Sequence, residues 1–131
     1  MLATPEVYAK LQGPWLDETV ERRMAQLQTD LEVFTSANFI DKAYLKRLQR
    51  SDGIWEIRSC RPRPSLRVFG AFGDLDVLVI THMAERRNLG AGNSREWAEE
   101  IRRTKAIWRN LFPSYDWEKG ESIDDVLTQT I

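Results

Sequence analysis

The sequence predicts an α+β fold in which N-terminal helices pack on one face of a small antiparallel β-meander of three or four strands. A C-terminal helix follows the meander. Two observations predict the helices: apolar residues recur at helical spacing in residues 17–34 and again in residues 94–110. The third observation is a series of three short apolar runs between residues 54 and 82, joined by short connections. With 131 residues and 42% hydrophobic side chains, the chain is long enough for one domain with its own core.

The first helix is predicted over residues 17–34 and the second over residues 39–49. Spacings of three and four residues place the apolar side chains of the first helix in one stripe. That stripe consists of Val20, Met24, Leu27, Leu31 and Phe34. The second helix carries its apolar side chains at Ile40, Tyr44, Leu45 and Leu48. The turn formed by residues 51–53 ends it.

Three strands are predicted at about residues 54–60, 65–72 and 76–82. Pro62 and Pro64 exclude a regular strand between the first two, because proline cannot donate to the ladder. Since both connections are short, the three strands form an antiparallel meander.

The last helix is predicted over residues 94–110 and is stopped by Pro113. Residues 1–112 therefore form a single domain, and residues 113–131 form an acidic C-terminal tail. This tail combines acidic residues with an apolar period. It either folds over the basic part of the chain and masks it, or stays frayed and solvated.

The overall net charge of −1 conceals an uneven distribution along the chain. Residues 1–40 carry three basic and six acidic side chains, and residues 113–131 carry one and five. The middle segment, residues 41–112, carries fifteen basic and nine acidic side chains, a net charge of +6. Either the basic middle binds an anionic ligand, or it reflects ordinary drift of surface charge.

The composition argues against a membrane or metal-dependent protein. No apolar run approaches the ~20 residues needed to span a bilayer, so no membrane partner is expected. The N-terminus lacks the basic and apolar regions of a secretory signal. A single cysteine, Cys60, is typical of the reducing cytoplasm. With one cysteine and one histidine, we expect no metal site and no cofactor.

The first hairpin predicts a pair of arginines facing each other. A four-residue loop over 61–64 pairs Cys60 with Ser65 and sets Arg58 directly opposite Arg67 on one face. The other face carries apolar side chains that would pack on the helices. These are Trp55, Ile57, Leu66 and Val68.

Two like charges directly opposite in a ladder destabilise it. Either Glu56, diagonal to Arg67, offsets the repulsion and leaves Arg58 solvated, or the two arginines hold an anion. Phe69 lies on the same predicted face and favours the second interpretation, because arginine and aromatic rings together suit phosphates and stacked bases.

The face on which His82 lies depends on the second turn. A loop of two residues at Gly73-Asp74, or of four residues, places His82 on the arginine face together with Leu78 and Ile80. A three-residue loop reverses the parity and places them in the core.

Four further arginines are candidate RNA contacts. Arg61 and Arg63 lie on the first connection, and Arg86 and Arg87 follow the third strand. The latter two either reach the arginine face or form a solvated basic loop.

Two runs of sequence carry a family resemblance. The segment 44–48 (YLKRL) leads into 51–58 (SDGIWEIR), and Arg67-Val68-Phe69 and the apolar run 77–82 follow. This arrangement resembles the RelE/ParE toxin superfamily in its phage-derived, HigB-like branch. The resemblance covers about residues 17–105.

The resemblance implies a RelE-like fold and a small cytoplasmic toxin of a type II toxin–antitoxin module. Many members cut mRNA on the ribosome without a metal, whereas related branches act on gyrase. The implied partners are mRNA, the ribosome and an antitoxin, often of helix-turn-helix type; a homodimer is kept open as an assembly. Arg58 and Arg67 would occupy the family's arginine positions.

In RNA cleavage the 2′-hydroxyl attacks the neighbouring phosphate, which requires proton transfer and cations for the developing charge. Arg58 and Arg67 are the expected cations. His82 is the expected acid or base, because the unperturbed pKa of histidine lies near neutrality. The loop 85–90 is rich in arginine but lacks the lysines usual in the family. A non-catalytic protein that binds a protein or nucleic acid, and a gyrase inhibitor, therefore stay open as alternatives.

Overall fold

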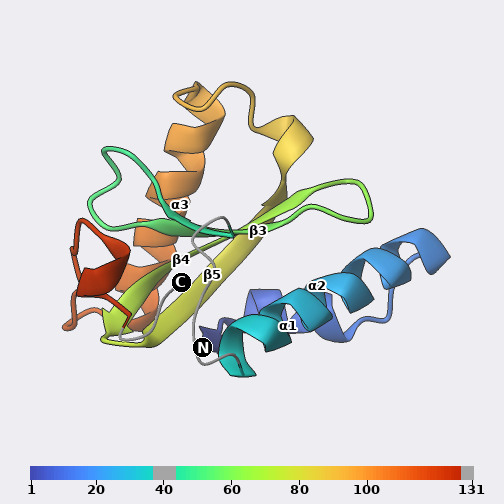
Figure 1. Cartoon of the computed structure of the whole chain (residues 1–131), viewed down its shortest axis with the longest axis horizontal. Helices are drawn as coiled ribbons and strands as arrows, with labels where there is room; N and C mark the ends of the chain where they lie inside the picture. The colour runs from blue at the N-terminus through green and yellow to red at the C-terminus, as the bar shows by residue number, and fades with distance from the viewer. Residues whose placement is uncertain (37–43, 128–131) are drawn as a thin grey trace.

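The computed structural model describes residues 1–36 and 44–127 and has an α+β fold. Its mixed sheet has the strand order β1-β5-β4-β3-β2 (Figure 1). β1 runs parallel to β5, and all other neighbours are antiparallel. The strands are β1 (Leu2–Ala3), β2 (Leu45–Arg47), β3 (Trp55–Ser59), β4 (Leu66–Asp74) and β5 (Val77–Glu85).

Three α-helices in the described ranges cover the two faces of this sheet. They are α1 (Pro5–Gln12), α2 (Glu18–Ser36) and α3 (Arg95–Leu111), and the short 3-10 helices are η1 (Arg86–Asn88) and η2 (Ile123–Asp125). In Figure 1, α1 and α2 lie on one side of the sheet and α3 on the other. The predicted helices at 17–34 and 94–110 are confirmed as α2 and α3.

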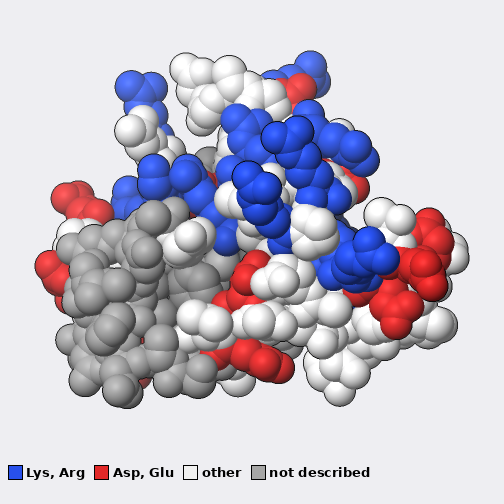
Figure 2. Space-filling model, turned by 45° about the vertical axis from the view of Figure 1, so that its right-hand side comes forward, with Lys and Arg blue, Asp and Glu red and all other residues white. Residues whose placement is uncertain are grey.

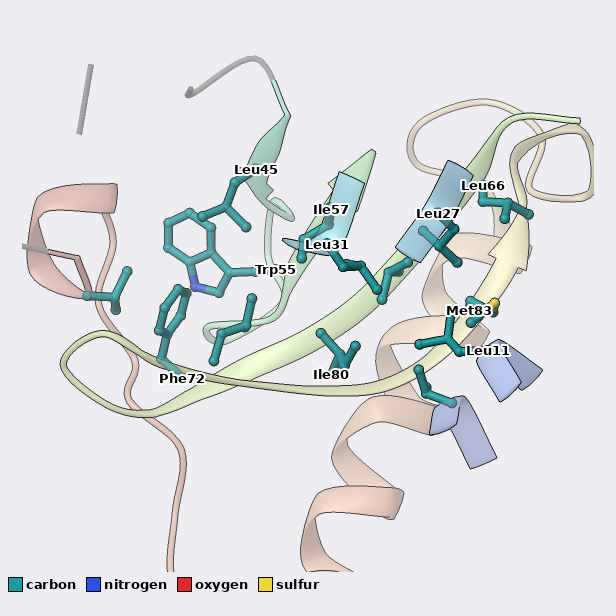
Figure 3. Close-up of a cluster of buried hydrophobic side chains, with 14 of the residues drawn as sticks. Leu11, Leu27, Leu31, Leu45, Trp55, Ile57, Leu66, Phe72, Ile80 and Met83 are labelled. Atoms are coloured by element: carbon teal, nitrogen blue, oxygen red, sulfur yellow. The ribbon is translucent and has the colours of Figure 1, made fainter. Parts of the chain in front are cut away.

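The main core lies between the sheet and the pair α1 and α2. Leu11, Leu27 and Leu31 of the helices meet Trp55 and Ile80 of the sheet there (Figure 3). The alternating residues that the sequence assigned to this face are all buried in it. They are Trp55, Ile57, Leu66 and Val68.

The predicted meander is confirmed, including its register. Arg58 pairs with Arg67 and Ser59 with Leu66, as the four-residue loop requires. The sheet is larger than the predicted three or four strands, because β1 and β2 extend it at the two edges.

The helix predicted over residues 39–49 is wrong in its second half, and residues 39–43 lie outside the described residues. Leu45–Arg47 forms β2 instead, with Leu45 paired to Ile57. Leu45 is buried and the next residue, Lys46, is exposed, which is the alternation of a strand. These residues pair with the edge of β3, although their apolar side chains are spaced as in a helix.

The N-terminal strand and helix were not predicted. β1 has two residues, too few to produce a pattern in the sequence. Thr4 links it to α1: its backbone N–H donates to Ile80 O (3.1 Å), and its hydroxyl donates to Thr81 O (2.7 Å). Thr4 also caps α1, with Pro5 at the first helical position.

A β-bulge in β5 decides where its side chains point, so turn length alone does not give the face of His82. The turn has two residues, as one of the predicted alternatives had, but they are Leu75 and Asp76 instead of Gly73 and Asp74. The register shifts between Phe72 and Asp74 and again between Phe69 and Gly70. Gly70 pairs with Ile80 while Phe69 pairs with His82, which leaves Thr81 as the extra residue. The strand therefore turns Leu78 and Ile80 to the main core but His82 to the opposite face.

The described part of the C-terminal segment, 113–127, is packed and not frayed. It does not cover Arg58 or Arg67, but it contacts Arg47, whose Nε donates to Gly120 O (2.9 Å). Trp117 and Val126 are buried, and Glu118 N–H donates to Phe72 O (2.7 Å). The segment passes close to Gly53, where an added Cβ would lie 2.7 Å from Glu118 O. It thus closes the end of the sheet near the turn between β4 and β5.

Across the described ranges, 1–36 and 44–127, we find no helix that combines the length and the apolar character needed to cross a membrane.

Candidate functional site

An open pocket of about 520 Å³ lies where β2, β3, β4, η1 and α3 meet. Its cations come from four of these elements, and Glu56 is the one carboxylate among the described residues that line it. We call it the arginine pocket and define it by Lys46, Arg47, Glu56, Arg58, Arg67, Arg86 and Trp97. Figure 2 shows Lys and Arg side chains gathered in a band across one face of the molecule.

The pair Arg58 and Arg67 forms the floor of this pocket, with Glu56 between them. Arg58 Nε lies 3.1 Å from Glu56 Oε1, and Arg67 Nε lies 3.7 Å from Glu56 Oε2. One buried carboxylate is therefore shared by two guanidinium groups, which leaves a net positive charge at the floor. The sequence left two alternatives: Glu56 offsets the repulsion between the arginines, or the arginines hold an anion. The structure is compatible with both, because the carboxylate offsets the repulsion only in part.

Arg67 is the more buried of the two arginines, with 8% of its surface exposed. Burial lowers its pKa below the ordinary value, and the charge of Glu56 opposes that shift. Its Nη1 donates to Leu66 O at 3.1 Å. Within the described part of the chain, Arg67 Nε and Glu56 Oε2 are buried without a hydrogen-bond partner. The floor therefore retains unused hydrogen-bonding capacity.

Arg86 and Trp97 form the opposite wall. The guanidinium carbon of Arg86 lies 5.6 Å from the centre of the Trp97 ring, within the range of a cation–π contact. Arg86 Nη1 also donates to Gly90 O at 2.9 Å. These contacts place Arg86 at the pocket, which corresponds to one of the two alternatives that the sequence left open for it.

The other arginines that the sequence predicted to contact RNA lie outside the arginine pocket. Arg61 and Arg63 are exposed on the loop between β3 and β4. Arg87 is exposed too, and its Nε lies 2.6 Å from Glu85 Oε2. Arg87 is therefore a solvated loop residue with a carboxylate partner of its own.

Phe69 and His82 lie on the same face as Arg67 but are covered by α3. Both have 0% exposure, and their rings stack with centres 5.0 Å apart. Trp97 packs edge-on against Phe69. A base cannot stack on Phe69 in this fold, and no ligand reaches His82 directly. In this fold Phe69 therefore cannot make the expected contact with RNA, and His82 cannot make the expected proton transfer to a ligand.

His82 is held in a polar contact beneath α3. Its Nε2 lies 2.5 Å from Glu100 Oε2, and its Nδ1 lies 3.0 Å from Thr81 Oγ1. Burial lowers the pKa of His82 to about 4, with a smaller effect of Arg103 in the same direction. The ring is then neutral at pH 7, and its Nε2–H donates to Glu100. Burial also raises the pKa of Glu100.

Sequence reasoning missed three of the residues that define the arginine pocket. Lys46 and Arg47 lay in the segment expected to be a helix, so their positions beside the strands were not foreseen. Trp97 was part of the apolar stripe of α3, which it is, but its ring also borders the pocket. The interruption of the apolar run by Lys46-Arg47 was the available signal for an exposed strand edge.

The arrangement can bind an anion. In the part of the chain that the structure describes, five cations and one carboxylate line the open volume, and that carboxylate is already shared. Among the residues of the two described ranges, no three His, Cys, Asp or Glu side chains are grouped to hold a metal ion. The fold and the site thus define an α+β protein with a cationic surface pocket. No family model, curated protein or solved structure matches this chain.

Proposed function

We propose that the protein binds single-stranded RNA at the arginine pocket and acts as a RelE-like toxin that cleaves mRNA on the ribosome. The observation that carries the proposal is the pair Arg58 and Arg67, set side by side at the floor of an open pocket. Guanidinium groups suit phosphate because their planar donors match its oxygens. Trp97 supplies an aromatic border, and rings beside cations are typical of single-strand binding sites.

The chemical contribution of this pocket is electrostatic. Attack by a ribose 2′-hydroxyl on the adjacent phosphate forms the P–O2′ bond and breaks the P–O5′ bond, which gives a 2′,3′-cyclic phosphate and a free 5′-hydroxyl. Solvent water would accept the 2′-hydroxyl proton and supply the proton of the departing 5′-oxygen. The attack places extra negative charge on the phosphoryl oxygens. Arg58 and Arg67 would stabilise that charge, and Glu56 would keep the two side chains in place. His82 has no role in proton transfer in this proposal, because its ring has no exposed surface.

A second candidate is RNA binding without cleavage. The burial of His82 favours it, because the chain's one histidine is the side chain whose ordinary pKa best suits proton transfer at pH 7. In that case the same pocket would bind RNA and release it unchanged.

Binding is tested with a labelled single-stranded RNA and the variant Arg58→Gln. Glu56 keeps Arg67 as a partner in this variant, so the fold is retained. Loss of one charged phosphate contact is expected to weaken binding about tenfold or more. The matched control is Arg102→Gln, which removes an exposed arginine of α3 that does not line the pocket. Equal affinity of the two variants would contradict the proposal.

Cleavage is tested by inducing the protein in bacteria and following growth and mRNA integrity. Fragmented mRNA with the unchanged chain, and intact mRNA with Arg58→Gln, are the expected results. Arrested growth with intact mRNA and induced DNA damage would point to gyrase instead. RNA binding in vitro with no effect on growth or mRNA would favour the second candidate.

A further inference from the structure

A second open pocket adjoins the arginine pocket, and Arg58 lines both. This second pocket has a volume of about 610 Å³ and lies between β2, the β3–β4 loop and α2. Besides Arg58 it is lined by Tyr44, Cys60 and Arg61, and by Gln26 and Asp30 of α2. We call it the tyrosine pocket. Arg58, with 31% of its side chain exposed, forms the wall between the two.

Tyr44 offers an aromatic surface in this second pocket. The residue is 49% exposed, although its backbone is fixed: Arg58 N–H donates to Tyr44 O at 2.9 Å. The bond continues the register of β2 with β3, so Tyr44 lies opposite Arg58 and both residues line the tyrosine pocket. An exposed ring on a fixed backbone beside an arginine suits the stacking of a base whose phosphate the arginine binds.

The charge of the tyrosine pocket also favours a polyanion. Arg58 and Arg61 contribute two cations. Among the described residues, Asp30 is the one carboxylate in its lining, and protein donors already occupy both of its oxygens. Gln26 Nε2 donates to Oδ1 at 3.0 Å, and Ser59 Oγ donates to Oδ2 at 2.6 Å. The pocket therefore presents positive charge and an aromatic ring to solvent.

We infer that the two pockets form one continuous track for a single RNA strand. Arg58 contacts the phosphate at the boundary, and Tyr44 stacks the base that follows it in the tyrosine pocket. This inference rests on the proposed function, since it extends the same RNA site. It adds that the site is longer than one phosphate, so that affinity depends on strand length and on Tyr44.

The position of Cys60 gives a direct readout of occupancy. It is the chain's single cysteine, it is exposed, and it lines the tyrosine pocket. The experiment measures the rate at which iodoacetamide alkylates Cys60 in the full chain, alone and with saturating oligouridylate of two or six nucleotides. We expect the hexanucleotide to slow alkylation severalfold and the dinucleotide to leave it nearly unchanged.

The variant Tyr44→Ala tests the stacking contact. It is expected to weaken hexanucleotide binding at least about fivefold, to leave dinucleotide binding unchanged, and to lose the protection of Cys60. Tyr44→Phe should restore all three properties, because the ring is kept. A hexanucleotide that binds in an Arg58-dependent manner while Cys60 reacts at the rate of the free protein would overturn the track. Absence of any RNA binding would overturn the proposed function as well.

Discussion

Arg67 is a buried cation whose only charged partner within the described residues is shared with a second arginine. The distance of 3.7 Å from its Nε to Glu56 Oε2 allows an ion pair but leaves the hydrogen bond unmade. Glu56 is itself 2% exposed, so its charge has lost nearly all contact with water. Each of the two charges is tolerable only because of the other.

Glu56→Gln should therefore destabilise the fold by about 3 kcal/mol, because two opposed arginines then lose their common carboxylate. Inorganic phosphate should recover part of this loss by taking the carboxylate's place as the anion at the floor of the pocket. The measurement is urea denaturation with phosphate or with chloride at equal ionic strength. The gain from phosphate should be larger in Glu56→Gln than in the unchanged chain; an equal gain would mean that the anion does not bind there.

The buried His82 predicts a loss of stability at acidic pH. In the unfolded chain its pKa is near 6.5, whereas in the fold it is about 4. Between these values the unfolded chain binds the extra proton, so the free energy of unfolding falls as the pH falls, by up to ~1.4 kcal/mol per pH unit. The raised pKa of Glu100 acts in the opposite direction and reduces the slope.

His82→Gln is the matching variant, because its amide can still donate to Glu100 but does not titrate. Denaturation curves from pH 7 to pH 4 should show a shallower decline for this variant than for the unchanged chain. Parallel declines would show that other groups cause the acid sensitivity.

At the scale of elements, the bulge in β5 decides which face of the sheet carries His82. In a regular strand, His82 would share a face with Ile80 and point toward α1 and α2. The bulge lies opposite Gly70, where an added Cβ would lie 2.3 Å from Val79 O. Backbone atoms of β5 therefore occupy the space that a side chain at position 70 would need.

Gly70→Ala should accordingly destabilise the protein by about 1–3 kcal/mol, because the strand must shift to accept the methyl group. Gly92→Ala is the control, since an added Cβ there meets nothing within 4 Å. Thermal unfolding of both variants measures the difference. Similar melting temperatures would show that β5 adapts to the side chain without cost.

The same elements explain what the sequence could and could not predict. Pro62 and Pro64 limited the first loop, and this limit was sufficient to place Arg58 opposite Arg67. The bulge left no comparable signal, because Thr81 differs in no way from a regular strand residue. β2 was mistaken for a helix, since three residues are too few to establish an alternating pattern. The pocket's floor was thus predictable, whereas its wall at Trp97 required the position of α3.

At the scale of the whole molecule, the C-terminal segment completes the core behind the sheet. Trp117 packs edge-on against Trp108, and its Nε1 donates to Asp52 O at 2.6 Å. None of the described residues after 113 lines the arginine pocket. The acidic residues of this segment therefore lower the net charge of the protein without covering its basic face.

Trp117→Ala should lower the free energy of unfolding by about 3 kcal/mol, because it removes a buried ring and leaves a cavity. The affinity of the folded variant for RNA should not change. If the segment masked the site, loosening it would raise that affinity. Urea denaturation and RNA titration on the same preparation separate the two effects. A rise in RNA affinity would restore the masking hypothesis.

The return of the C-terminal segment to the sheet also sets an order of events during synthesis. The hairpin of β4 and β5 is synthesised before Trp117 and Val126, yet both residues cover its apolar side chains. The hydrogen bond from Asp76 N–H to Val126 O (2.8 Å) can likewise form only once residue 126 has been added. A nascent chain thus carries an unfinished sheet until late in its synthesis. The apolar end of the sheet is covered only after the ribosome has passed residue 126.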